Sequence, residues 1–341
     1  MNRLYEHDFD KFYTQKIEPV LLPFEKKRAS IDFQKRLALI PLVFIIVTIM
    51  YMRINFIQEG PMVFVVIALT VFSLIESSYI WFLDSQFNKT FKKDVTSKIL
   101  ALFGNLYFSD KKNAVPYSDI QKWGLFPSST DKLDDDVIIG IHKGCNFLIN
   151  ECDIYHSRPE RDSNGHSQIR YIYDFSGLII KIQMKKKFTG QTIVGETGKI
   201  KRQGRFEEVN LESISFMKRR KVYSTDQIEA RYLLTTAFME RLDKLADNFN
   251  YSSIDGIRLS DEERSARIDV SSILADNSDS DVSAAFVGGF IYLFVPTNKD
   301  FFEVDTKKSL LNSKQFYNIY NEIFSILDII EFLKLDKNLG L

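Results

Sequence analysis

Four side chains of the kind that bind metals lie close together in the chain: His142, Cys145, Cys152 and His156, spaced H-x2-C-x6-C-x3-H. Histidine and cysteine are the common protein ligands of zinc, and they must converge within about 2.0 to 2.3 Å of one ion. Lys143-Gly144 favours a hairpin turn, which places Cys145 opposite His142. Cys152 then lies seven residues beyond Cys145 on the same strand, roughly 23 Å from it at ~3.3 Å per residue. We therefore expect sheet packing here, with no metal and no other cofactor.

A second motif, Gly195-Glu196-Thr197-Gly198-Lys199, is similar to a phosphate-binding loop. That loop needs an earlier glycine and a Ser or Thr after the lysine, where this chain has Ile193 and Ile200. We expect a turn between strands. The four histidines have no serine or cysteine partner that the sequence can place, so no catalytic residue is assigned.

The polar residues Glu229, Arg231 and Tyr232 open a segment with helical spacing. Arg231 could grip a carboxylate or phosphate of a ligand with its planar guanidinium. Alternatively, it pairs with an acid of this chain, and such a partly buried pair would make Arg231 structural. The candidate acids are Glu207, Glu208 and Glu212. The helix itself is expected to begin with a cap at Ser224 or Asp226.

Two short basic runs are further candidate binding residues: Lys185-Lys186-Lys187 and Lys218-Arg219-Arg220-Lys221. Basic side chains near an anionic membrane surface contribute roughly 1 kcal/mol each. The runs would then hold the domain against membrane lipids. The alternative is that they are solvated strand ends.

Leu37 to Leu83 holds two apolar runs, Leu37 to Ile57 and Met62 to Leu83, separated by Gln58-Glu59-Gly60-Pro61. Each run has the roughly 20 residues that a helix needs to cross a bilayer. The sequence therefore predicts a transmembrane helical hairpin. Glu76 lies within the second run, and an ionisable residue inside a membrane is a functional candidate.

Lysine and arginine flank both outer ends of the hairpin, while its connecting loop carries only Arg53 and Glu59. Such residues are retained on the cytoplasmic side. We expect a multi-pass protein of the cell (inner) membrane with both termini in the cytoplasm. The two cysteines and the balance of 45 basic against 45 acidic residues suit a reducing compartment and do not suggest nucleic-acid binding.

The remaining elements position these residues. We expect an amphipathic cytoplasmic segment at 1–36, interrupted at Pro19 and Pro23, the hairpin at 37–83, a stalk helix at 84–104 and a cytoplasmic domain at 105–341. In that domain, strands flank Lys143-Gly144 and Gly288-Gly289, and strands are also expected at 169–173 and 178–184. Helices are expected from Tyr117 with Ser118 as cap, at 230–248 with a split at Thr235-Thr236, and near the C-terminus. The class is α+β with a mainly antiparallel sheet.

The segment Lys221 to Leu242, KVYSTDQIEARYLLTTAFMERL, resembles the signature of the bacterial family catalogued as domain of unknown function 3137 (DUF3137). Supporting pieces are Gly124-Leu125-Phe126, Asp136 to Gly140, Phe175 to Ile179, Val209 to Glu212 and Ile329 to Leu333. The membrane hairpin also fits the layout of that family. The resemblance implies this layout and implies no activity.

Taken together, these features predict a membrane-anchored cytoplasmic binding or scaffold domain for a protein, a peptide or a lipid headgroup. A membrane-tethered hydrolase or transferase is the alternative, and it would need a polar pocket with a perturbed titratable group. We expect a protein partner and allow for a homo-oligomer. The sequence does not identify the ligand.

Overall fold

The structure is a computed structural model that describes residues 6–54, 60–109, 113–161, 167–185, 188–251, 281–297, 301–302 and 304–333. The chain divides into two compact units. The helical unit comprises Asn2–Leu102 and Val304–Tyr317, and the sheet unit comprises Phe103–Glu303 and Asn318–Leu341. Helices and an antiparallel sheet are both present, so the predicted α+β class is confirmed.

The helical unit begins with α1 (Glu6–Phe12), a π-helical turn η1 (Tyr13–Ile17) and α2 (Glu18–Leu37). The predicted interruptions at Pro19 and Pro23 are wrong. Pro19 lies in the first turn of α2, where its missing N–H has no intrahelical partner in any case, and Pro23 lies inside α2. The irregularity falls instead on η1, a single π-helical turn between α1 and α2.

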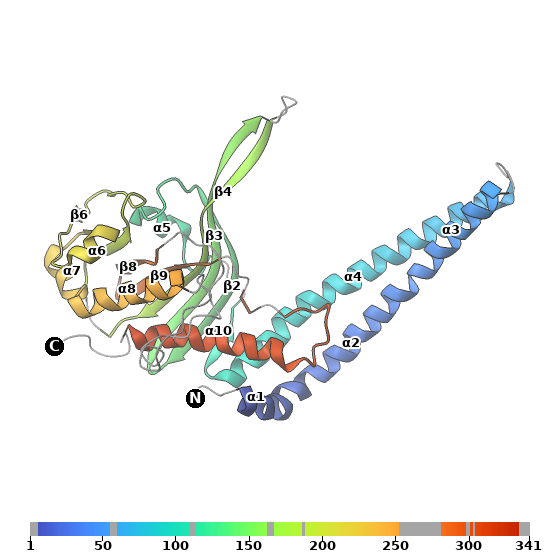
Figure 1. The fold of residues 1–341 in the computed structure, drawn as a ribbon, viewed down its shortest axis with the longest axis horizontal. Helices are drawn as coiled ribbons and strands as arrows, with labels where there is room; N and C mark the ends of the chain where they lie inside the picture. The colour runs from blue at the N-terminus through green and yellow to red at the C-terminus, as the bar shows by residue number, and fades with distance from the viewer. Residues whose placement is uncertain are drawn as a thin grey trace. The chain divides into compact units, whose positions relative to one another are not determined.

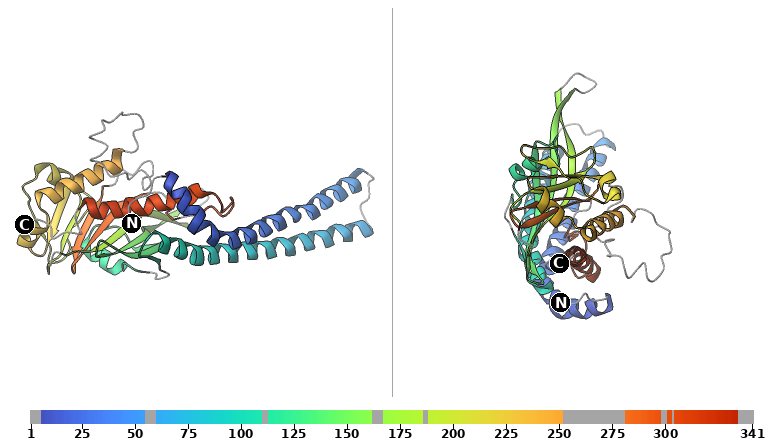
Figure 2. Two further views of the ribbon diagram at one scale, coloured as in Figure 1. Left: turned by 90° about the horizontal axis from the view of Figure 1, so that it is seen from below. Right: turned by 90° about the vertical axis from the view of Figure 1, so that its left-hand side faces the viewer.

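The two predicted apolar runs are helical. Helix α3 (Leu39–Ile54) follows α2 after one residue, and α4 (Pro61–Phe103) runs back alongside α2 and α3 (Figures 1 and 2). Residues 55–59 of the connecting loop lie outside the described part. An ion pair between Lys35 and Asp84 joins α2 to α4 at 2.8 Å.

Two helical segments, Asp8–Ile54, which includes α3, and Pro61–Phe103, which is α4, are long and apolar enough to be candidate membrane spans. The most apolar stretch of the first segment has no buried residues, and 11% of the most apolar stretch of the second is buried. Helix α3 has no buried residue. A core helix of a soluble domain would instead bury an apolar stripe.

The C-terminal half of α4 does bury such a stripe, at Phe87, Phe91, Val95 and Ile99. The ring of Phe24 in α2 packs edge-on to that of Phe91, with 5.9 Å between the ring centroids, so the segment before the hairpin covers part of the stripe. Residues 304–317 join the same unit. There the carboxylate of Glu25 accepts the backbone N–H of Leu310 at 2.8 Å.

In the part of the sheet unit that the structure describes, nine antiparallel strands follow the order β1-β2-β3-β4-β9-β8-β5-β7-β6. Their bounds are β1 (Leu106–Phe108), β2 (Asp131–His142), β3 (Cys145–Arg161), β4 (Ser167–Gln183), β5 (Thr192–Glu196), β6 (Glu207–Glu208), β7 (Arg220–Ser224), β8 (Ser283–Val287) and β9 (Phe290–Pro296). The predicted turns at Lys143-Gly144 and Gly288-Gly289 are confirmed, since His142 pairs with Cys145 and Val287 pairs with Phe290.

Strands β3 and β4 are longer than predicted. The two separate strands expected at 169–173 and 178–184 are one strand, β4, which passes through Gly177. A Cβ at Gly177 would overlap the carbonyl oxygen of Val295 in β9. The glycine therefore permits close strand contact and does not end the strand.

Within the described residues, five helices accompany the sheet: α5 (Tyr117–Trp123), α6 (Ile214–Arg219), α7 (Gln227–Leu233), α8 (Thr236–Tyr251) and α10 (Ser313–Phe332), the last of which also extends into the helical unit. The split at Thr235 is confirmed, but the N-cap of α5 is Pro116 and not Ser118. On one sheet face, Trp123 of α5 packs against Tyr292 and Phe294. On the other, Phe238 of α8 packs against Phe286 at 5.7 Å.

Candidate functional site

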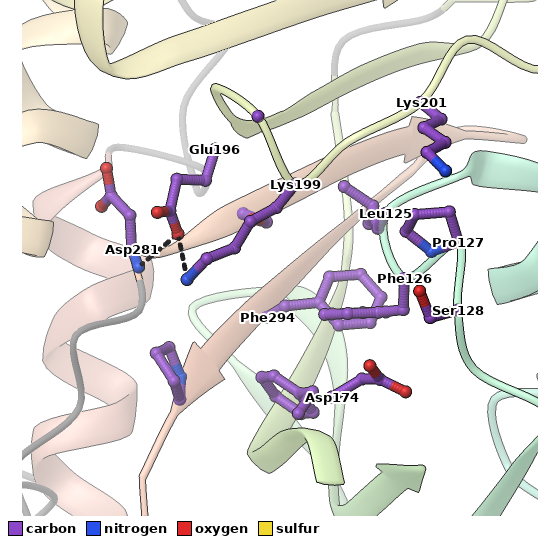
Figure 3. Close-up of a pocket in the computed structure, with 14 residues that line it drawn as sticks. Leu125, Phe126, Pro127, Ser128, Asp174, Glu196, Lys199, Lys201, Asp281 and Phe294 are labelled. Carbon is purple, nitrogen blue, oxygen red and sulfur yellow. Dashed lines mark hydrogen bonds and ion pairs between the residues drawn. The ribbon is translucent and has the colours of Figure 1, made fainter. Parts of the chain in front are cut away.

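A cavity of about 310 Å³ opens in the sheet unit (Figure 3). The segment after α5, the turn after β5, the middle of β4, the residues at the start of β8 and the end of β9 contribute to it. Its lining residues are Leu125, Phe126, Pro127, Ser128, Asp174, Phe175, Glu196, Gly198, Lys199, Lys201, Asp281, Ser283, Phe294 and Pro296. The cavity is therefore assembled from segments far apart in the sequence.

The floor of this pocket is aromatic. The ring centroids of Phe126, Phe175 and Phe294 lie 5.3 to 5.8 Å from one another. Two of the three contacts are edge-to-face, which is a favoured arrangement of aromatic rings. Phe175 and Phe294 are buried, whereas Phe126 is half-buried and reaches the opening. This floor suits an apolar group.

Gly124 fixes the two loops that form one wall. It ends α5 in the left-handed region, with φ 67°. Its carbonyl oxygen accepts the backbone N–H of Lys201 at 3.0 Å, and a Cβ at position 124 would overlap the carbonyl oxygen of Lys201. Only glycine combines this backbone conformation with this close approach.

Most charged groups at the rim are already paired with groups of the chain, and the exposed Lys201 has no side-chain partner among the described residues. Lys199 contacts Glu196 at 2.8 Å, across the turn that ends β5. Figure 3 shows this pair beside Asp281, whose backbone N–H donates to Glu196 at 3.4 Å. The predicted turn at Gly195 to Lys199 is confirmed, because the N–H groups of Lys199 and Ile200 both donate to the Glu196 carbonyl.

Asp174, another lining residue, holds His156. Its carboxylate lies 2.8 Å from Nδ1 of His156, a buried side chain of β3. The pair lies at a register shift between β3 and β4, next to Ile154 and Tyr155. Within the described residues, Nε2 of His156 is buried and has no hydrogen-bond partner.

The hairpin turn at Lys143-Gly144 determines where His142, Cys145, Cys152 and His156 lie. His142 lies opposite Cys145 at the hairpin end, whereas Cys152 lies opposite Asp134 farther along the ladder. Nε2 of His142 lies 2.7 Å from Glu331 of α10, and Lys143 also pairs with that carboxylate. Burial opposes ionisation of Glu331, but the hydrogen bonds from Lys143 and His142 outweigh burial and lower its pKa.

The carboxylates of Asp135, Asp136 and Glu151 lie within 4.8 Å of one another, a grouping that the sequence analysis missed. Glu151 also accepts the backbone N–H of Phe301 at 3.2 Å. The bulge between Asp134 and Val137 brings neighbouring acids of β2 toward β3. Bulges cannot be recognised from the spacing of these residues alone.

The basic run Lys218 to Lys221 does not form one exposed surface. Arg220 is fully buried, pairs with Asp243 of α8 and contacts Asp281 at 2.6 Å. Its guanidinium also lies 5.1 Å from the ring centroid of Phe216. The expectation of a surface run is therefore wrong for Arg220, because the start of β7 turns this side chain into the core. Lys218 is exposed and Arg219 contacts Asp281 at 3.5 Å.

Burial around Arg220 affects its acidic partner as well. Burial raises the pKa of Asp281, and the nearby charges of Arg220 and Arg219 oppose that rise. Asp281 lines the pocket and Asp243 does not. The buried arginine thus connects helix α8 to the pocket rim.

In the signature helix α7, Asp226 is the N-cap and accepts the N–H groups of Ile228 and Glu229. Glu229 turns to another segment, where its carboxylate accepts the N–H groups of Thr189 and Gly190 at 2.8 and 2.6 Å. Glu229 therefore fixes a loop, while Tyr232 is 44% exposed.

Arg231 does not pair with any of the three acids that the sequence analysis suggested. It is exposed and donates to the carbonyl oxygens of Gln227 and Asn210. Glu207 accepts from Gln227 instead, and Glu208 pairs with Lys221. The predicted buried ion pair is wrong at Arg231, and Arg220 forms the pair of that kind.

Two other candidates lie elsewhere. Glu76 is on α4, two helical turns before Asp84, and Ser73 beside it is buried. Oε2 of Glu76 is buried without a hydrogen-bond partner among the described residues. Of the run Lys185-Lys186-Lys187, only the exposed Lys185 is described, and the other two residues lie outside the described part.

The family described as "Protein of unknown function (DUF3137)" matches residues 173–259 and 272–335, which confirms the resemblance seen in the sequence. No curated protein matches the chain. A solved structure, the crystal structure of the mycobacterial trehalose monomycolate transport factor A, TtfA, matches with 11% sequence identity and a TM-score of 0.30. The match covers 66% of this chain and 88% of that chain. A likeness at this level supports no inference about function.

Proposed function

We propose that the protein is a membrane-anchored binding module. In this proposal α3 and the apolar half of α4 cross the cell membrane as a hairpin, and the sheet unit lies in the cytoplasm. Support comes from large apolar side chains that α3 and α4 expose, among them Phe44, Ile46, Phe64 and Ile75. Leaving each in water forgoes roughly 1.5 to 3 kcal/mol of burial free energy. A bilayer removes that cost.

The flanks of the hairpin support the orientation. Basic residues precede α3 and follow the apolar half of α4, where they are retained in the cytoplasm. Tyr79 and Trp81 are exposed just before Asp84. Tyrosine and tryptophan at that level are typical of the membrane–water interface. The Lys35–Asp84 pair then lies at the cytoplasmic boundary.

We infer that the pocket receives an apolar side chain of a protein partner. The observation that carries this inference is the aromatic floor of Phe126, Phe175 and Phe294. An anionic lipid headgroup would need several cations available to it, but Lys199 is paired with Glu196, and Lys201 is the one lysine of the lining whose side chain has no partner among the described residues. The volume of about 310 Å³ is at the lower end for ligand pockets and fits one or two side chains.

One observation favours the alternative of a tethered hydrolase or transferase. His156 and Asp174 form the arrangement of a base and the acid that orients it, and Asp174 lines the pocket. However, Nε2 of His156 is buried, and a general base must reach the proton that it abstracts. The geometry therefore supports binding better than catalysis.

Site-specific photo-crosslinking tests the binding function. A benzoyl-phenylalanine replaces Phe126 in the full-length protein in native membranes, and the control carries it at Ile228, which is 82% exposed and does not line the pocket. We expect a discrete protein adduct from position 126 that is absent from position 228. Ser128→Trp, which places a large side chain in the lining, should remove it. Equal adducts at both positions, or an adduct that Ser128→Trp leaves unchanged, would contradict the proposal.

A further inference from the structure

Strands β3 and β4 continue beyond the rest of the sheet as a two-stranded ribbon (Figure 1). The pairing of β2 with β3 stops at Asp131, the first residue of β2, which lies opposite Tyr155. The pairing of β9 with β4 stops at Pro296, which lies opposite Gly177. Beyond these points β3 and β4 pair with each other as far as Arg161 and Ser167. We call residues 155–161 and 167–173 the arm. An isolated two-stranded ribbon is marginally stable in water unless one face is covered.

One face of the arm is apolar and aromatic. The pairs Tyr155 with Tyr173, Ser157 with Tyr171 and Pro159 with Ile169 lie opposite each other, so all six side chains share this face. Ile169, Tyr171 and Tyr173 are 66%, 56% and 59% exposed. The opposite face carries the pair of Arg158 with Arg170, together with Glu160. The tyrosine face is thus an exposed apolar surface within the described part of the chain.

Opposite charges lie at the two ends of the tyrosine face. Asp153 lies two residues before Tyr155, on the same face and at the base of the arm. Asp131, opposite Tyr155, accepts its hydroxyl at 3.4 Å and adds a second carboxylate there. The far end carries Arg161, which is exposed. Neither Asp153 nor Arg161 has an ion-pair partner in the described part of the chain.

We propose that the tyrosine face binds the same face of a second copy of this chain, in antiparallel orientation about a two-fold axis at Ser157 and Tyr171. The spacing is self-complementary. Asp153 and Arg161 are each four residues from Ser157, so each meets the other across the axis. Such reciprocal contacts are what a two-fold interface requires.

The apolar residues obey the same symmetry. Tyr155 and Pro159 are each two residues from Ser157, and Tyr173 and Ile169 are each two residues from Tyr171. A tyrosine of one copy therefore packs on a proline or isoleucine of the other. Two sheet faces packed in this way lie about 10 Å apart, a distance that side chains of this size fill.

The charges on the tyrosine face favour a second copy of this chain over other partners. A uniformly basic or acidic partner would meet a like charge at one end of the face, and an anionic membrane surface would repel Asp131 and Asp153. The tyrosine face holds six side chains, fewer than the roughly 20 to 30 residues per partner of a standard interface. The dimer is therefore weak. It forms where the local concentration of the chain is high, as it is when many copies are anchored in the same membrane.

Cysteine crosslinking in the full-length protein tests the axis. Ser157→Cys places a thiol on the axis, and Glu160→Cys places one on the opposite face as a matched control. The native Cys145 and Cys152 are buried, and burial raises the pKa of Cys152, which keeps it unreactive. With a short bismaleimide in membranes, we expect a covalent dimer from Ser157→Cys alone. Equal yields from both variants, or none from Ser157→Cys, would overturn the proposal.

Charge-reversing substitutions added to the Ser157→Cys variant test the contact between Asp153 of one copy and Arg161 of the other. Asp153→Arg and Arg161→Asp should each lower the dimer yield roughly tenfold, because two exposed ion pairs become repulsive. The double variant restores opposite charges across the axis and should recover the yield. A double variant as low as either single variant would refute the antiparallel arrangement. Recovery also shows that the single variants did not fail through misfolding.

Discussion

Replacing Arg220 with methionine should destabilise the sheet unit strongly. The arginine is 0% exposed, and its partners Asp243 and Asp281 have side chains that are 20% and 9% exposed. Removing one side of a buried pair leaves uncompensated charge and costs about 3 to 5 kcal/mol. For a domain of roughly 150 to 250 residues, each kcal/mol lowers the melting temperature by about 2 to 4 °C. We expect a fall of roughly 6 to 20 °C.

Thermal unfolding of the full-length protein in detergent, followed by circular dichroism, measures this change. Arg231→Met is the matched control, because Arg231 is exposed and donates only to backbone carbonyls. Its effect should stay within about 0.5 kcal/mol. Neutralising both acids in the Arg220→Met background, with Asp243→Asn and Asp281→Asn, should recover part of the loss. An Arg220→Met protein that melts like wild type would refute the reasoning.

Three further outcomes are expected. Gly124→Ala should lower the free energy of unfolding, measured with urea, by about 1 to 3 kcal/mol. Gly198→Ala, whose added Cβ meets no other atom, should lower it less. Equal losses would count against the close contact between Gly124 and Lys201. Glu331→Gln should lower the melting temperature at pH 7. The difference from wild type should shrink as the pH falls below the ordinary glutamate pKa of about 4.3 and vanish once the pH is below the lowered pKa of Glu331 in the folded protein, since only the ionised form is stabilised. Glu76→Gln should leave the amount of protein in membranes unchanged, because the amide keeps the shape and removes a costly charge; a loss of protein, seen by immunoblotting, would give the carboxylate a structural role.

Local signals in the sequence predicted the local structure well. Gly-Gly at 288–289 and Lys-Gly at 143–144 specify tight turns through backbone conformations with positive φ, and both hairpins form there. Asp226 caps α7 for a similar reason, since a carboxylate three residues before Glu229 can accept its free N–H. These features depend on residues that are neighbours in the chain.

Features that depend on distant residues were not predicted. Arg220 pairs with residues 23 and 61 positions away, and nothing in the run Lys218 to Lys221 distinguishes the buried arginine from its exposed neighbours. The single strand β4 was expected as two strands, and Gly177 within it allows Val295 to approach. The pocket likewise needs Phe126, Phe175 and Phe294, which the sequence alone does not bring together.

The central claim, a cytoplasmic binding unit anchored by two spans, is tested most directly by topology reporters on the full-length chain. Alkaline phosphatase, active only outside the cytoplasm, and a fluorescent protein that folds inside it are each fused after Leu341, and in parallel inserted at Gly60. We predict fluorescence without phosphatase activity at Leu341, and phosphatase activity without fluorescence at Gly60. Phosphatase activity at Leu341, or fluorescence at both positions, would contradict the hairpin and its orientation.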